Sequence, residues 1–186
     1  MKKKDIRYYR TRKNIISAMT RLLRKNYFEQ ITVTTICEEA QISRSGFYLH
    51  YLDKYDLVES YLKEFIDYAN EVFQKQKQKD IGAFLLYMLT HLKNEEELLS
   101  LLLSKHGSVE IQDKIKQIMR ENARKNILPY LTLTLQNEIE ERYTLAFLSN
   151  ALLGTFQEWI NSGQKETPEQ MMQIIRRLIG YDFKKI

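Results

Sequence analysis

The sequence predicts an all-α fold, with an N-terminal domain of three helices in residues 1–54 and a larger helical bundle in residues 55–186. Only 6 Gly and 2 Pro occur among 186 residues, so the residue types that form frequent sheet turns are scarce. With 44% hydrophobic and 28% charged residues, the chain can bury a core. Apolar residues also recur at helical spacing along most of the chain.

The first helix is expected over about residues 5–25. Ile15, Met19 and Leu22 recur at helical spacing there, and basic residues fill the other faces. Asn26 is a natural end for this helix, because asparagine tolerates the left-handed conformation that terminates many helices.

Two short helices should follow. Thr32 can cap the first of them, over residues 33–40, with its side-chain oxygen. Ser43 can cap the next, in which Phe47 and Tyr51 lie one turn apart and therefore on one face. Asp53 can then cap a long helix that nothing interrupts before about residue 79.

The rest of the chain should also be helical. Apolar clusters predict helices over residues 84–92, 98–103, 111–119, 143–160 and 171–179. Breaks are expected near Asn94, Gly107, Pro129 and residues 162–168. Residues 131–136 alternate like a strand, but a lone strand has nothing to pair with, so we expect a helix or a connector.

The positive charge of the chain is confined to its N-terminal part. Residues 1–56 contain 12 Lys and Arg against 6 Asp and Glu, a balance of +6, whereas the remaining residues balance at −1. This distribution is typical of a protein that meets a polyanion with one end. A solvated basic face without a partner is the alternative.

Several classes of protein are not favoured. No apolar run reaches the roughly 18 to 20 residues of a membrane span, so we expect a cytoplasmic protein without a membrane partner. The single Cys37 excludes an intramolecular disulfide and a cysteine-cluster metal site. Because no glycine-rich phosphate loop, nucleophile elbow or supported carboxylate pair occurs, we expect no enzyme, no cofactor and no metal.

The two short helices, joined at residues 41–43 and braced by the first helix, predict a helix-turn-helix. In that arrangement the second helix lies in the major groove of DNA and its flanking residues hold phosphates. Arg44 can pair bidentately with a guanine edge. Tyr48, His50 and Lys54 can donate to phosphate oxygens, and Gly46 suits a close approach of the backbone to DNA.

The segment ITVTTICEEAQISRSGFYLHYLDKYDL, residues 31–57, resembles the N-terminal domain of the TetR family of bacterial transcriptional regulators. FLSNALLGTFQEWINSG followed by TPEQMMQIIRRLIG is similar to the closing helix pair through which many members dimerise. One departure is Gln41, which stands where the family usually has glycine, so the turn is either strained or avoids a positive φ. Cys37, in place of the usual alanine, is expected to be buried.

The resemblance implies a repressor that binds an inverted-repeat DNA operator as a homodimer and is released by a small apolar or aromatic effector. The expected DNA-binding residues are Thr34, Ser43, Arg44, Ser45, Gly46, Tyr48, His50 and Lys54. The expected effector-pocket residues are Tyr68, Phe84, Tyr87, Met88, His91, Met119 and Phe147. The expected dimer-interface residues are Ala151, Gly154, Trp159, Met171, Ile175 and Leu178, for which a core within one protomer is the alternative.

Two other functions fit the same features. A helical protein-interaction module on a DNA-binding scaffold would have a fully packed C-terminal core and no small-molecule ligand. A transcriptional activator could share the same DNA-binding surface.

Overall fold

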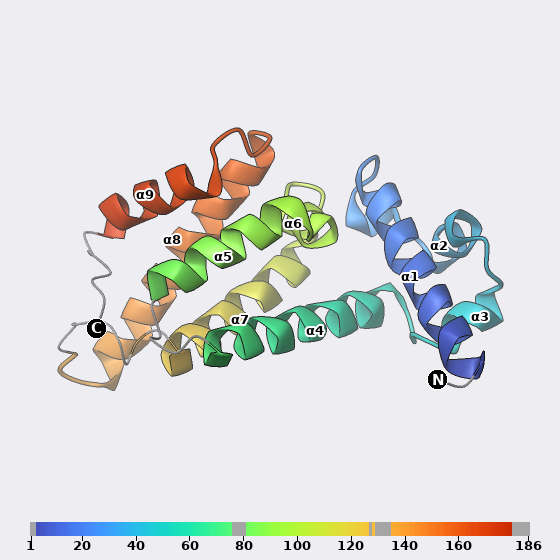
Figure 1. Ribbon diagram of the computed structural model, residues 1–186, viewed down its shortest axis with the longest axis horizontal. Helices are drawn as coiled ribbons and strands as arrows, with labels where there is room; N and C mark the ends of the chain where they lie inside the picture. Colours follow the sequence, from blue (N-terminus) through green and yellow to red (C-terminus); the bar gives the residue numbers. More distant parts are fainter. Residues whose placement is uncertain (1–2, 76–80, 127, 129–134, 180–186) are drawn as a thin grey trace.

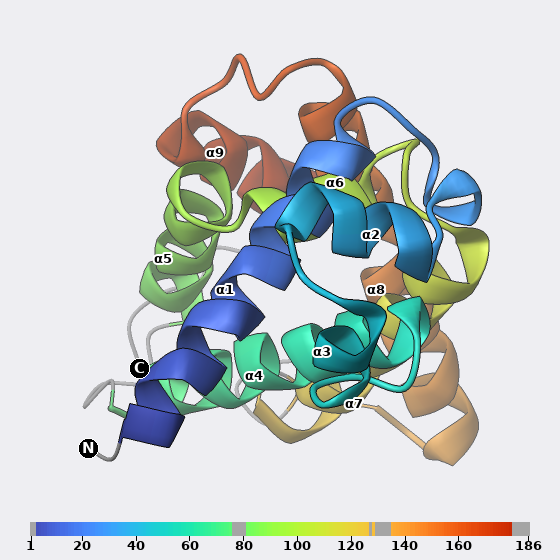
Figure 2. The same ribbon diagram turned by 90° about the vertical axis from the view of Figure 1, so that its right-hand side faces the viewer.

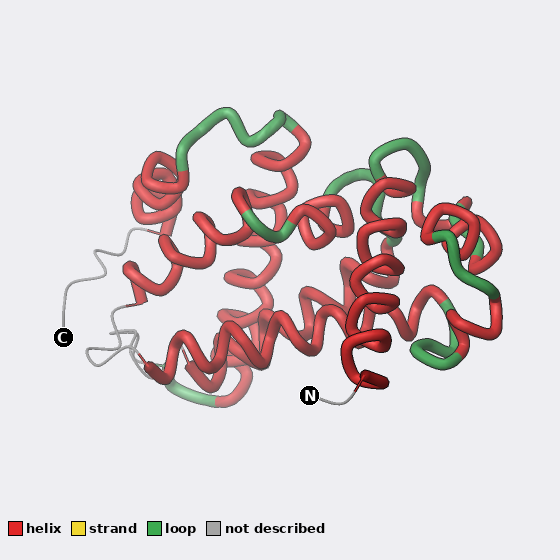
Figure 3. The backbone as a smooth tube through the Cα atoms, turned by 45° about the vertical axis from the view of Figure 1, so that its right-hand side comes forward, coloured by secondary structure: helices red, strands yellow, loops and turns green. Residues whose placement is uncertain are grey.

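The structure is a computed structural model that describes residues 3–75, 81–126, 128 and 135–179. Within these residues every regular element is helical (Figure 3), which confirms the predicted all-α fold. The elements are α1 (Lys3–Leu23), the 3₁₀ turn η1 (Phe28–Gln30), α2 (Val33–Ala40), α3 (Arg44–Tyr48), α4 (Lys54–Lys75), α5 (Ile81–Asn94), α6 (Glu97–Leu103), α7 (Val109–Asn126), α8 (Glu138–Asn161) and α9 (Pro168–Ile179).

Helices α1, α2 and α3 stand at one end of the elongated molecule, and α4 leads from them into the bundle (Figure 1). Viewed from that end, α2 and α3 both lie on the same side of α1 (Figure 2). Their common core contains the fully buried side chains of Met19, Phe28, Ile36 and Phe47. Because the core fixes α1, α2 and α3 to one another, the outer face of α3 is held on a rigid support.

The predicted caps of α2, α3 and α4 are all present. The Thr32 hydroxyl accepts a hydrogen bond from the Thr35 N–H at 3.1 Å, and the Ser43 hydroxyl accepts one from the Gly46 N–H at 3.0 Å. The Asp53 carboxylate accepts the N–H groups of residues 55 and 56 at 2.8 Å each. Gln41 adopts φ 55° and ψ 48°, so the turn takes the strained alternative, at a cost of about 1 kcal/mol for a left-handed residue other than glycine.

The prediction for Asn26 is wrong. Helix α1 ends at Leu23, and within the described ranges positive φ values occur only at Gln41, Gly163 and Gln164. Asn26 instead closes the turn by hydrogen bonding, because its backbone N–H and its side-chain amide both donate to the Leu22 carbonyl oxygen, at 3.0 and 2.9 Å.

Helices α4 to α9 form a bundle in which α8 packs on α7 and α9 packs on α5. The loop between α8 and α9 is fixed to the bundle by Lys93, whose ammonium donates to the carbonyl oxygens of Gln164 and Glu166 at 2.8 and 3.0 Å. Residues 76–80, Pro129 and residues 131–134 lie outside the described residues, and with them parts of the predictions for the end of α4 and for residues 131–136. Leu135 and Gln136 are not helical.

Helix α6 joins the bundle to α1. The Arg24 guanidinium donates to both carboxylate oxygens of Glu97, at 2.5 and 2.6 Å, and this hydrogen bonding lowers the pKa of Glu97. In the loop after α6, His106 accepts the Phe28 N–H on its carbonyl oxygen at 2.9 Å, and its ring Nδ1 lies 2.7 Å from the Leu23 carbonyl oxygen. The end of α1 is therefore held against α6.

In the described part of the chain, no helix combines the length and the apolar character that crossing a membrane requires.

Candidate functional site

The outer face of α3 and the first turn of α2 present polar side chains to solvent. Thr34, Ser43, Arg44 and Ser45 are exposed, as predicted for DNA-binding residues. Phe47 is fully buried and Tyr51 nearly so, and together they anchor α3 from below. Their access to solvent leaves these four side chains open to a partner.

Arg44 and Tyr48 form a pair along the exposed side of α3. The Arg44 guanidinium donates to the Tyr48 hydroxyl at 3.3 Å and lies 6.0 Å from the centre of its ring. This hydrogen bond raises the pKa of Arg44. The pair holds a planar cation with a hydroxyl beside it, which suits recognition of base edges and phosphate oxygens.

Gly46 is half-buried, and its small size has a local reason. A Cβ atom added at this position would stand 3.3 Å from the Ser43 hydroxyl oxygen, which is tighter than most Cβ contacts. Glycine at this position therefore leaves room for the Ser43 cap of α3, a local reason beside the predicted close approach of the backbone to DNA.

His50 is placed differently from the prediction that it holds phosphate. Its ring stacks on Tyr8 of α1 with the ring centres 4.1 Å apart, and its buried Nδ1 has no hydrogen-bond partner in the described residues. Burial, with the nearby Arg12 guanidinium, lowers the pKa of His50. This shift favours the uncharged ring, which packs α1 against the residues that follow α3.

Lys54, for which a phosphate contact is predicted, makes its hydrogen bonds within the protein. Its ammonium donates to three main-chain carbonyl oxygens, those of Phe28 at 2.8 Å, Ile31 at 2.9 Å and Glu29 at 3.1 Å. It also lies 4.6 Å from the centre of the Phe28 ring. Burial lowers the pKa of Lys54. All three protons of the ammonium are engaged, so none points freely outward to a phosphate.

Leu49 belongs to the exposed face of α3 and is not among the predicted DNA-binding residues. It is 79% exposed, although leucine is normally buried. Its N–H donates to the Ser45 carbonyl oxygen at 3.2 Å, so it continues the helix with Ser45 on the same face, one turn earlier. The spacing of four residues from Ser45 was the available signal.

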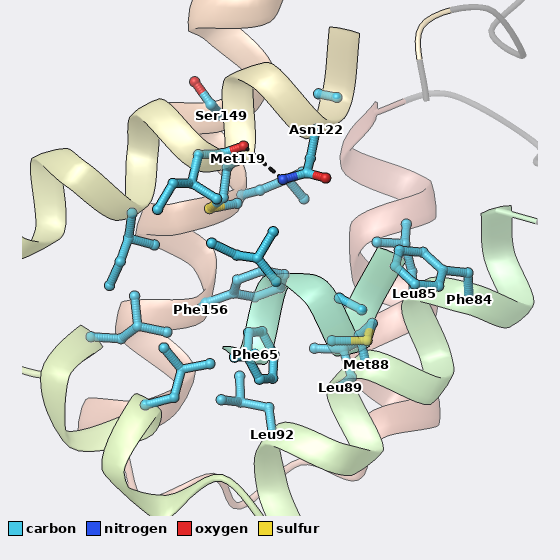
Figure 4. A pocket seen from close by; sticks show the side chains of 18 of the residues that line it. Phe65, Phe84, Leu85, Met88, Leu89, Leu92, Met119, Asn122, Ser149 and Phe156 are labelled. Carbon is cyan, nitrogen blue, oxygen red and sulfur yellow. Dashed lines mark hydrogen bonds between the residues drawn. The ribbon is translucent and has the colours of Figure 1, made fainter. Parts of the chain in front are cut away.

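A second feature is an apolar cavity inside the bundle, with a volume of about 230 Å³. Figure 4 shows Phe65, Met88, Met119 and Phe156 among the side chains around it. Polar groups among its described lining residues are few: Asn70, Asn122 and Ser149. Asn122 donates to the Ile118 carbonyl oxygen at 3.1 Å and Ser149 to that of Ala146 at 3.1 Å, so these donors are used within their own helices. Of the predicted pocket residues, Phe84, Met88 and Met119 line the cavity.

The other four predicted pocket residues are outside it. Tyr68 and Tyr87 hydrogen-bond to each other through their hydroxyl groups, on the side of α4 and α5 that faces away from the cavity lining. His91 lies beside them, with its ring nitrogens 3.3 Å from the Glu95 carboxylate and 3.1 Å from that of Glu96. Phe147 is 71% exposed, because it projects outward from α8.

The predicted dimer residues divide into two groups. Ala151 and Gly154 on α8 and Leu178 on α9 are exposed. Trp159, Met171 and Ile175 are buried within the protomer, which fits the alternative of a core within one protomer. The Trp159 indole N–H donates to the Glu166 carbonyl oxygen at 3.2 Å, which fixes it inside the α8–α9 corner.

Helices α8 and α9 each expose more apolar residues than predicted. Tyr143 and Phe147 precede Ala151 and Gly154 at spacings of three or four residues, so the four lie on one side of α8. Ile174 and Leu178 are exposed one turn apart on α9. We call this set of six residues the α8–α9 face.

The chain resembles regulators of transcription in its sequence. A family model described as the C-terminal region of transcriptional regulators, of the TetR type, matches residues 79–181, more than half of the chain. The search of curated proteins finds no match.

Solved structures show the same fold over nearly the full chain. A TetR transcriptional regulator from Streptococcus agalactiae is 21% identical, with a TM-score of 0.72 and coverage of 95% of this chain and 97% of that one. NalD from Pseudomonas aeruginosa, described as the secondary repressor of the MexAB-OprM multidrug efflux pump, is 18% identical, with a TM-score of 0.65 and coverage of 93% and 95%. DhaS, described as a dihydroxyacetone kinase operon activator, is 17% identical, with a TM-score of 0.63 and coverage of 91% and 94%.

The match to the C-terminal region and the shared fold agree with the helix-turn-helix geometry of α2 and α3. The chain therefore belongs to the TetR family of transcriptional regulators.

Proposed function

We propose that this protein is a cytoplasmic repressor that binds an inverted-repeat operator as a homodimer and releases it when a small apolar ligand occupies the bundle cavity. Residues 1–54 would bind DNA, and residues 55–186 would hold the ligand and the dimer contacts. The observation that carries the proposal is the exposed face of α3, where Arg44, Ser45 and Tyr48 stand on a helix anchored by buried Phe47.

Charge and symmetry support this proposal. The balance of +6 in residues 1–56 favours association with the DNA backbone. A single short recognition helix contacts few base pairs, so specific recognition favours two copies on two half-sites. The α8–α9 face supplies an exposed apolar surface through which the copies can associate.

The cavity supports control by a ligand. Its lining includes Leu62, Phe65 and Phe73 of α4, the helix that begins within a few residues of α3. A ligand that prefers one position of α4 would change the spacing of the two recognition helices. It can lower operator affinity only by the difference between its affinities for the two states. The unfilled cavity also argues against a protein-interaction module, whose C-terminal core would be fully packed.

Repression requires fewer additional interactions than activation does. A dimer seated on an operator blocks access to that DNA by its bulk alone, whereas activation also requires a surface that recruits the transcription machinery. NalD is described as a repressor and DhaS as an activator, so this fold occurs in proteins that repress and in proteins that activate. A reporter gene behind the selected operator distinguishes them, because deleting the regulator should raise expression if it represses.

Selection from a random duplex DNA library at about 0.15 M salt should enrich an inverted repeat. The reason is that two symmetry-related α3 helices read the same bases in opposite directions. The Arg44→Ala variant should select a relaxed motif at one guanine per half-site, because the bidentate contact is worth about 1 to 3 kcal/mol. Recovery of unselected sequence by the parent protein would contradict the proposal.

Filling the cavity should abolish the response to a ligand while leaving DNA binding intact. Ala123 on α7 is buried in the lining, so Ala123→Leu would occupy part of the 230 Å³. Toluene is a suitable probe, since a smaller engineered apolar cavity of about 150 Å³ binds benzene. We expect toluene to raise the melting temperature of the parent protein and to release labelled operator in an anisotropy assay, and to do neither with Ala123→Leu.

The control for this experiment is Ala83→Leu, which makes the same change at an exposed position on α5 outside the lining. It should respond to toluene like the parent. If Ala123→Leu kept the full response, the ligand would bind elsewhere and the cavity would be a packing defect.

A further inference from the structure

Leu49 is an exposed apolar side chain on the outer face of α3, next to the exposed polar residues Arg44 and Ser45. On a helical projection it lies with Ser45 opposite the buried Phe47, and therefore on the part of α3 that is farthest from the protein core. Its backbone angles, φ −73° and ψ −16°, keep it in helical geometry as the C-cap of α3. The position of the side chain is thus fixed by the helix.

The fold gives no reason for leucine at this position. The side chain is 79% exposed, so the core does not use it, and the cap is made by its backbone N–H. Burying a leucine side chain is normally favourable, and that gain is absent in the free protein. It becomes available only if a partner covers the outer face of α3.

We propose that Leu49 reads a thymine in each operator half-site by contacting its C5 methyl group. The proposal rests on the proposed function, because the partner is taken to be DNA in which α3 enters the major groove. Of the groups exposed in the major groove, the thymine methyl is the apolar one that leucine can cover. Positive charge around α3 and its continuity with Arg44 and Tyr48 favour DNA over an apolar protein partner.

Arg44, Ser45 and Leu49 would each contact a different base of the half-site. Arg44 is held toward Tyr48 on one flank of α3, so it reads a different base from Leu49. Ser45, one turn before Leu49, can bond to an adjacent base edge through its hydroxyl. A half-site with a guanine and a thymine a few base pairs apart is the expected pattern.

The test uses the operator selected from synthetic, unmethylated DNA, in which thymine is the only source of a C5 methyl group. Each thymine is replaced in turn by deoxyuridine, which removes the methyl group and keeps the base-pairing edge. Affinities are measured by anisotropy for the parent dimer and for Leu49→Ala. At one symmetric position the parent should bind about fourfold more weakly per half-site without the methyl, as expected for one buried carbon, and Leu49→Ala should bind both DNAs equally.

The matched control is Leu52→Ala, which truncates a leucine that is 80% exposed but lies beyond α3. It should keep the full sensitivity to deoxyuridine. Specific binding by the parent without any methyl position coupled to Leu49 would overturn the inference and leave the proposed function standing. Coupling to Leu52 in place of Leu49 would overturn it as well. Failure to select any operator would instead count against the proposed function.

Discussion

Phe147→Glu should convert the protein to monomers and weaken operator binding by at least about 100-fold. Two half-sites held by one dimer bind with an effective concentration that raises avidity by about 10² to 10⁴. A monomer loses that gain although its α3 surface is unchanged. The substitution should therefore weaken DNA binding although Phe147 lies on α8 of the bundle and not on α3.

The α8–α9 face explains the size of the effect. Phe147 is 71% exposed, with Tyr143 and Ala151 one turn away on either side of it. In an interface with twofold symmetry each residue occurs twice, so the substitution places two carboxylates in one apolar contact. Burying unpaired carboxylates costs several kcal/mol, which is comparable to the free energy of many protein associations.

Sedimentation and operator titration would measure the two consequences. Val109→Glu is the matched control, because Val109 is 74% exposed on α7 and lies outside the α8–α9 face. The control should remain dimeric and bind DNA like the parent. A Phe147→Glu protein that stayed dimeric would show that the copies associate through another surface.

Local chemistry explains which parts of the fold could be predicted from the sequence. Thr32, Ser43 and Asp53 cap the helices that they were expected to cap, because a cap depends on residues two or three positions away. The burial of Phe47 and Tyr51 follows in the same way from their spacing on one helix. These features set the position of α3 and its exposed face.

Lys54 and His50 make contacts with partners that are distant in the sequence. Lys54 binds carbonyl oxygens 23 to 26 positions earlier, and the Tyr8 ring that packs on His50 belongs to α1. Both residues have the polar side chains of a DNA contact, so residue type alone favoured that role. The residue type of Trp159 likewise favours an interface, but in the structure its indole N–H donates to the carbonyl oxygen of Glu166 within the protomer.

The residues of the cavity and of the α8–α9 face also could not be predicted from the sequence alone. A helix in the middle of a bundle is apolar on several sides, and its sequence does not say which side meets the interior. Phe147 and Leu148 are adjacent and both apolar, but Phe147 is exposed whereas Leu148 lines the cavity. Only the packing of α8 on α7 distinguishes them.

Lys54→Met should lower the free energy of unfolding by about 2 to 3 kcal/mol, because hydrogen bonds to charged groups are among the strongest and this change leaves their acceptors unpaired. The three carbonyl oxygens that the ammonium holds belong to Phe28, Glu29 and Ile31, at and just after η1. These groups orient the link between α1 and α2, so the loss should be felt by the whole helix-turn-helix. For a chain of this size we expect a melting temperature lower by about 5 to 10 °C.

Lys63→Met is the matched control, since Lys63 is exposed on the same helix and the substitution removes the same charge. Its melting temperature should stay close to that of the parent.

A structural role and a phosphate-binding role of Lys54 predict opposite results for stability and for the salt dependence of operator affinity. A structural ammonium gives a less stable protein whose operator affinity, measured well below the melting temperature, keeps its salt dependence. A phosphate-binding ammonium gives unchanged stability and a slope of log affinity against log salt that is smaller by about one. Because Lys54 already donates to three carbonyl oxygens, we expect the first result.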